Sequence, residues 1–180
     1  MKLAFIGTHG TGKTTLCHLL TGEMKRRGMN AGMVTEIARE CPLPINKKSQ
    51  PESQLWILMT QIARELDSQS KYEHVVCDRS VLDNYAYNVY NSGRHALMEH
   101  MVDSWIGSYD VLFKAPNCYP LVGDGVRDTD LRFQAEIDTL VDALLAEKSV
   151  PYVTLPADDQ LEFVVSYLKL PPPVNGNGKH

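Results

Sequence analysis

The chain has 180 residues, of which 43% are apolar and 22% charged, and its formal net charge is −4. This length and balance are typical of one globular domain, and a net negative charge disfavours a protein whose main partner is duplex DNA. No apolar run reaches the roughly 18 residues of a membrane span, and the first residues do not resemble a signal peptide. The four cysteines show neither C-x-x-C nor zinc spacing, so we expect a reduced, cytoplasmic protein without membrane contact.

Short apolar runs alternate with helical patterns along the chain. The predicted strands cover residues 3–6, 31–35, 74–78, 109–114 and 151–155. The predicted helices cover residues 13–28, 51–69, 81–90, 96–106, 131–148 and 158–168. Such alternation predicts an α/β fold in which a five-stranded parallel sheet is flanked by helices on both faces. Ligands of such sheets bind beyond the carboxyl ends of the strands.

The pattern indicates a single domain over residues 1–170. The glycine- and proline-containing loop at about 116–132 is a candidate lid, and the tail 171–180 is too poor in apolar residues to pack, so we expect disorder there. In the helix that begins at Pro51, the predicted buried face consists of Leu55, Leu58, Met59, Ile62 and Leu66.

The stretch from residue 7 to residue 14 reads GTHGTGKT and fits the pattern G-x-x-x-x-G-K-[ST] without a mismatch. It follows a predicted strand and precedes a predicted helix, which is the context that this phosphate-binding motif requires. Glycines allow successive backbone N–H groups to surround an anion, and the helix adds its positive N-terminal end. The expected phosphate ligands are Thr8, His9, Gly10, Thr11, Gly12, Lys13, Thr14 and Thr15.

Two side chains are predicted to complete a site for ATP and Mg²⁺. Lys13 is expected to reach the β- and γ-phosphates, and the Thr14 hydroxyl to bind Mg²⁺. Asp78 ends the apolar run at 74–78 and would hold the metal directly or through water. A capping role for Asp78 at the following helix is the alternative.

The triplet Asp78-Arg79-Ser80 at the end of a strand resembles the P-loop nucleoside and nucleotide kinases, including thymidylate and deoxynucleoside kinases. The segments VTEIARE (34–40) and DGVRDTDLRFQAEID (124–138) are similar to ribosylnicotinamide-kinase-like proteins, a type found in phage and bacteria. The resemblance covers residues 2–168. It implies the three-layer P-loop NTPase fold and phosphoryl transfer from ATP.

The resemblance also implies roles for individual residues. Arg127 and Arg132 would belong to a lid that closes over the phosphates, where arginine forks match phosphoryl oxygens. Arg79 would point at the acceptor. Glu36 and Asp78 both qualify as the carboxylate that receives or orients the acceptor hydroxyl.

Two further residues are candidate acceptor ligands. Arg39 lies one helical turn from Glu36 and pairing with it is the alternative, while Asp83 lies one turn beyond Arg79.

Three functions remain open from the sequence. The first is a kinase that acts on a nucleoside, a nucleotide or a related small molecule, as a monomer or a homodimer. The second is a kinase with a nucleic-acid acceptor, such as a modified base or a strand end, for which a duplex base would have to be flipped out. The third is a nucleotide-dependent switch that hydrolyses ATP, although no partner-facing switch loop is evident.

Overall fold

The computed structural model describes residues 1–118, 121 and 129–174. Its strands are β1 (Lys2–Ile6), β2 (Ala31–Val34), β3 (His74–Asp78), β4 (Val111–Lys114) and β5 (Val153–Thr154). Its helices are α1 (Lys13–Arg26), α2 (Pro51–Lys71), α3 (Val81–Ser92), α4 (Ala96–Trp105), α5 (Leu131–Glu147) and α6 (Gln160–Tyr167), with short 3₁₀ turns at Ile37–Glu40, Asn46–Lys48 and Ile106–Ser108. Most of the expected lid and residues 175–180 of the expected tail lie outside the described residues.

The five strands form one sheet in the order β2-β3-β1-β4-β5, and each neighbouring pair is parallel. The central strand β1 is buried along its whole length, as its wholly apolar sequence after Lys2 requires. The structure confirms the predicted α/β fold with a five-stranded parallel sheet.

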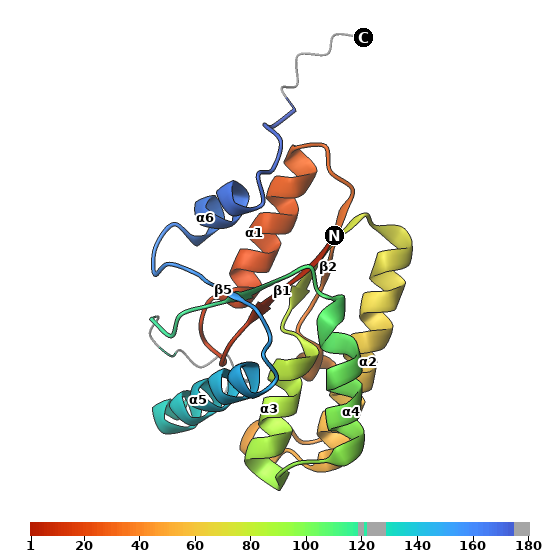
Figure 1. The fold of residues 1–180 in the computed structure, drawn as a ribbon, viewed down its shortest axis with the longest axis vertical. Coiled ribbons are helices and arrows are strands. Elements are labelled where there is room, and N and C mark those ends of the chain that lie inside the picture. Colours follow the sequence, from red (N-terminus) through yellow and green to blue (C-terminus); the bar gives the residue numbers. More distant parts are fainter. Residues whose placement is uncertain (119–120, 122–128, 175–180) are drawn as a thin grey trace.

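Helices cover both faces of this sheet, which gives three layers (Figure 1). On one face, Leu3 and Phe5 of β1 pack with residues of α1 and α6. On the other face, Ala4 and Ile6 pack with α2, α3, α4 and α5. Side chains alternate between the two faces because successive residues of a strand point in opposite directions.

Helix α2 buries only part of the face that its apolar residues predicted: Leu58 is buried, and Leu55 and Ile62 pack against the core. Met59 and Leu66 are each 55% exposed, whereas Gln61 and Glu65 are fully buried. Glu65 is buried because its carboxylate accepts from the ammonium of Lys2 at the start of β1. A pairing over 63 residues of chain overrides the local periodicity here.

The carboxyl ends of β1, β2 and β3 lead directly into the three segments that carry the predicted site. These are the glycine-rich loop before α1, the turn at Ile37–Glu40 and the junction between β3 and α3. No helix among the described residues has the length and apolarity needed to cross a membrane.

Candidate active site

The loop between β1 and α1 has the backbone of a phosphate cradle. Gly7, Gly10 and Gly12 have φ values of 122°, 78° and 78°, a region that favours glycine. A Cβ atom at Gly7 would also lie 3.2 Å from the carbonyl oxygen of Ala115. Helix α1 begins at Lys13, so its free N–H groups and its positive end face this loop.

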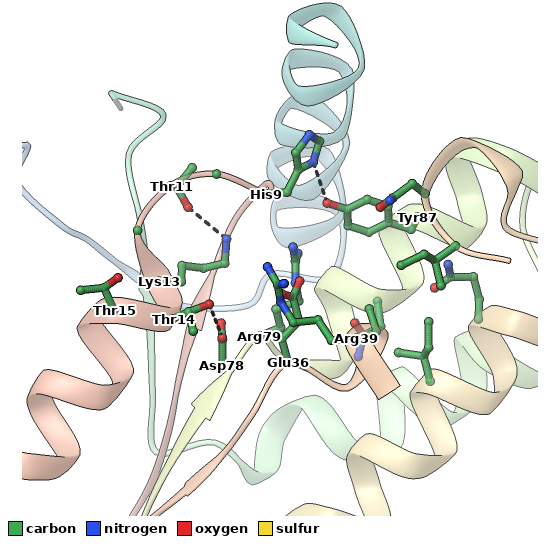
Figure 2. Close-up of a pocket in the computed structure, with 18 residues that line it drawn as sticks. His9, Thr11, Lys13, Thr14, Thr15, Glu36, Arg39, Asp78, Arg79 and Tyr87 are labelled. Carbon is green, nitrogen blue, oxygen red and sulfur yellow. Dashed lines mark hydrogen bonds and ion pairs between the residues drawn. The ribbon is translucent and has the colours of Figure 1, made fainter. Parts of the chain in front are cut away.

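Lys13 is folded into the cradle and only 5% exposed. Its ammonium donates to the carbonyl oxygen of Thr8 and to the Thr11 hydroxyl, the latter at 3.0 Å (Figure 2). Burial, reinforced by the charge of Arg79, lowers the pKa of Lys13 to about 8. The positive charge is thus held at a cost that an anion in the cradle would offset.

Thr14 and Asp78 meet where α1 begins and β3 ends. The Thr14 hydroxyl donates to Oδ2 of Asp78 at 2.6 Å. Burial, and then the charge of Glu36, raises the pKa of Asp78. A hydroxyl beside a carboxylate is an oxygen donor set that suits Mg²⁺, which keeps several waters and binds phosphate as well. These two residues therefore fit the predicted metal role.

Glu36 lies between two arginines. Its Oε1 accepts from Nε of Arg79 at 2.7 Å, and its Oε2 accepts from Nε of Arg39 at 2.8 Å. Burial opposes ionisation, but Arg79 and the other cations nearby outweigh it and lower the pKa of Glu36 to about 2. The pairing of Arg39 with Glu36 was the sequence alternative, and both side chains also line the pocket.

Arg79 has a backbone φ of 82°, an uncommon value for a residue with a side chain. The guanidinium is buried, donates weakly to the carbonyl oxygen of Gly7 at 3.4 Å, and lies 5.3 Å from the ring centre of Tyr87. The strained backbone turns this side chain from the end of β3 toward the cradle and Glu36, instead of toward solvent.

His9 joins the cradle to the opposite wall. Its Nδ1 lies 3.0 Å from the hydroxyl of Tyr87 on α3 (Figure 2). Its ring also packs against Phe133 of α5, with ring centres 5.3 Å apart. His9 is therefore a wall residue of the pocket.

Asp83 occupies a different place from the one predicted. It is fully buried and absent from the pocket lining. Its Oδ1 accepts from the backbone N–H of Gly7 at 2.6 Å, and its Oδ2 accepts from the N–H and hydroxyl of Ser80 at 2.9 and 2.8 Å. Because both oxygens are used inside the fold, Asp83 fixes the cradle to α3 and does not fit the role of an acceptor ligand.

Of the two predicted lid arginines, only Arg132 lies within the described residues, and it is not at the site. Arg127 lies outside the described residues. Arg132 has a side chain that is 87% exposed and pairs with Glu136 on its own helix, at 2.9 Å. It does not line the pocket, since the first turn of α5 directs it to solvent.

Of the expected phosphate ligands, Thr8 stands apart because it is fully buried and its hydroxyl donates to the carbonyl oxygen of Gln134 at 2.9 Å. The other seven line one pocket together with Glu36, Arg39, Asp78 and Arg79. The remaining lining residues are Ala38, Ile45, Asn46, Gln54, Ile57, Asn84 and Tyr87. Asn84 carried no motif in the sequence.

The family model of the AAA domain matches residues 2–162 of the chain. The chain belongs to this AAA domain family. A comparison with curated protein sequences found no match.

Solved structures share its fold across nearly the full length. A thymidylate kinase from Ehrlichia chaffeensis superposes with a TM-score of 0.66 at 19% identity, covering 93% of this chain and 98% of that one. A deoxyadenosine kinase from M. mycoides with dCMP and dCDP bound gives 0.62 at 15% identity, covering 94% and 99%. The same enzyme with dATP gives 0.64 at 17%, covering 94% and 99%. The fold of this AAA domain protein is thus the P-loop fold of nucleoside and nucleotide kinases.

Proposed function

We propose that this chain is an ATP-dependent kinase that transfers the γ-phosphoryl group to a hydroxyl or phosphate of a nucleoside, a nucleotide or a related small molecule. The observation that carries the proposal is the continuity of one pocket. Its lining runs from the phosphate cradle at residues 9–15 to Glu36, Arg39 and the α3 residues beyond Arg79. The phosphoryl donor and the phosphoryl acceptor could therefore bind side by side in this one pocket.

The cationic side chains of the pocket match the needs of phosphoryl transfer. In this reaction the protein mainly positions its substrates and neutralises charge on the transferred group. Lys13 would contact the β- and γ-phosphates, and the buried Arg79 guanidinium faces the same cradle through its contact with Gly7. When bound to Thr14 and Asp78, Mg²⁺ would neutralise phosphate charge.

The two carboxylates differ in the tasks that they suit. Glu36 is ionised and held by two guanidinium groups, so it is suited to accept a hydrogen bond from the acceptor hydroxyl and fix its direction. Its pKa of about 2 makes it a weak proton acceptor. The raised pKa of Asp78 makes that carboxyl the stronger base of the two.

The test is ADP release from Mg·ATP with a panel of acceptors. The panel contains nucleosides, nucleoside monophosphates, nicotinamide riboside, and single- and double-stranded DNA. We expect one small acceptor class to stimulate ADP release. Stimulation by DNA alone would assign a polynucleotide kinase, and slow hydrolysis that no acceptor changes would assign a nucleotide switch.

A matched pair of variants ties the activity to the site. Asp78→Asn should lower acceptor-dependent ADP release by about 10²-fold or more, because it weakens the predicted metal site. Asp67→Asn is the control, since Asp67 is exposed on α2 and pairs with Lys71. Equal activity of both variants would contradict the assignment of Asp78.

A further inference from the structure

The side chain of Asn84 is a buried amide with a free donor. Asn84 lies on α3, lines the pocket and is 4% exposed. Within the described part of the chain, its Nδ2 has no hydrogen-bond partner. An unpaired buried donor destabilises a fold, and buried polar groups are nearly always satisfied. A group of the ligand is therefore the natural partner of this N–H.

The pocket that Asn84 lines also has walls that suit a flat ring. Ile45 and Ile57 supply apolar surface to the pocket, and Tyr87 supplies an aromatic ring. Asn84 and Tyr87 are three residues apart on α3, so they lie on the same side of the helix. Aromatic and aliphatic side chains are the usual walls of a pocket for a planar heterocycle.

A second amide lines the same pocket. Gln54 of α2 is 4% exposed, and its Nε2 donates to the hydroxyl of Ser49 at 2.5 Å. This bond leaves the Gln54 carbonyl oxygen as the acceptor. Asn84 thus offers a hydrogen-bond donor and Gln54 a hydrogen-bond acceptor. The polar edge of a heterocyclic base carries both kinds of group and needs both kinds of partner.

We propose that Asn84 recognises the base of the acceptor by donating from Nδ2 to a carbonyl oxygen or a ring nitrogen, with the Gln54 carbonyl oxygen accepting from an N–H of the same ring. The inference rests on the proposed function and narrows it. The acceptor is a base-bearing compound, and a bare sugar would be a poor substitute. The charged residues Lys13, Glu36 and Arg79 act on the phosphoryl and hydroxyl groups instead.

The test compares wild type with Asn84→Ala, using a nucleoside and the matching sugar without its base. In the variant, kcat/KM for the nucleoside should fall roughly 10- to 100-fold, because the base loses its partner. The kcat/KM for the sugar and the KM for Mg·ATP should both stay within about twofold of the wild-type values. Asn88→Ala is the matched control, since Asn88 is buried one turn further along α3 and donates to Gly93 outside the pocket.

The polarity of the amide gives a second readout. Asn84→Asp replaces the donor by an acceptor, so the preference should move roughly tenfold toward bases with an exocyclic amino group at that edge. The proposal would be overturned if Asn84→Ala kept the wild-type preference for nucleoside over sugar. This holds whether kcat/KM stays the same for both acceptors or falls equally for both.

Binding without turnover separates this inference from the proposed function. Tm is measured with and without nucleoside in the absence of ATP. If wild type phosphorylates no acceptor but nucleoside raises its Tm, and Asn84→Ala abolishes that rise, the kinase assignment fails and the Asn84 subsite stands. If no nucleoside of the panel raises the Tm of wild type or is phosphorylated by it, the Asn84 subsite is overturned.

Discussion

The molecule has a buried ionic cluster at each end of its parallel sheet, and the two differ in what their charges face. Near the amino end of β1, Lys2 donates to Glu65 at 2.7 Å and to Ser108 at 2.6 Å, and lies over the rings of Trp105 and Tyr109. Glu65 also accepts from Trp105, Tyr109 and Gln61. Every charge in this cluster is matched by a partner within the fold.

At the carboxyl end of the sheet, Lys13, Glu36, Asp78 and Arg79 form the other cluster, and all four line the pocket. Burial lowers the pKa of Lys13 and raises that of Asp78, so these groups are held in forms that the fold alone does not favour. We call the Lys2–Glu65 group the closed cluster and the group of Lys13, Glu36, Asp78 and Arg79 the open cluster. The closed cluster fixes the register of the elements that it joins, whereas the open cluster keeps its charges available to a ligand.

The largest effect is expected from a substitution that disrupts the open cluster. Lys13→Met should lower kcat/KM for ATP by about 10²- to 10³-fold, the effect of removing one preorganised donor. The free energy of unfolding should stay the same or rise, because the variant removes a buried cation beside Arg79. Steady-state kinetics and urea unfolding measure the two quantities. A destabilised variant with unchanged kinetics would reverse the assignment of the two clusters.

The second prediction breaks the closed cluster. Glu65→Gln leaves the Lys2 ammonium buried without its counter-charge, so the free energy of unfolding should fall by about 3–5 kcal/mol. Activity per folded molecule, titrated with the nucleotide, should stay within about twofold, because Glu65 does not line the pocket. Loss of activity in folded protein would show that this cluster also serves the site.

The third prediction sharpens the role of charge in the closed cluster. Lys2→Met combined with Glu65→Gln removes both charges and keeps one amide oxygen, which can accept from either Trp105 or Tyr109. The double variant should regain at least about half of the stability lost by Glu65→Gln alone, since an uncompensated buried charge causes most of that loss. A double variant as unstable as the sum of both single variants would contradict this coupling.

The smallest effect is a pH dependence of the open cluster. Lys13 has a pKa of about 8 in the fold and 10.5 as its ordinary value. The protonated form is the one that binds phosphate, so kcat/KM for ATP should decline as pH rises above about 8. A profile that stays flat to pH 10 would contradict the buried position of the ammonium.

The same pKa shift has a consequence for stability. Between pH 8 and 10.5 the unfolded chain binds more protons at Lys13 than the folded chain does, so this residue makes the free energy of unfolding rise with pH over that window. Lys13→Met should lack this contribution. Urea unfolding of both proteins at pH 8 and pH 10 measures the difference, and equal slopes would count against the pKa shift.

The fold and the donor half of the site could be predicted from sequence because local patterns determine them. Apolar runs that alternate with helices gave the sheet, and the spacing of Gly7, Gly12 and Lys13 gave the cradle. Asp83 was misplaced because a helix position three residues after Ser80 indicates either a cap or a surface ligand. Only the fold brings the Gly7 amide to it.

The rest of the site depends on contacts between distant segments. Asn84 and Gln54 come from two helices whose apolar periodicity says nothing of a shared pocket. The positive φ of Arg79, between the end of β3 and the helix cap at Ser80, has no sequence signal either. In the sequence, Lys2 looks like an ordinary residue before a strand and Glu65 like an ordinary helix residue, and only the fold pairs them.

The carboxylate of Asp83 makes the amide proton of Gly7 a reporter for the first turn of α3. One oxygen holds that proton and the other holds Ser80 at the helix start. Exchange of the Gly7 amide with solvent deuterium therefore requires the Asp83 carboxylate to leave, which opens the helix start at the same time. The cradle is thus tied to the first turn of α3, and a nucleotide would enter a loop that is already shaped for it.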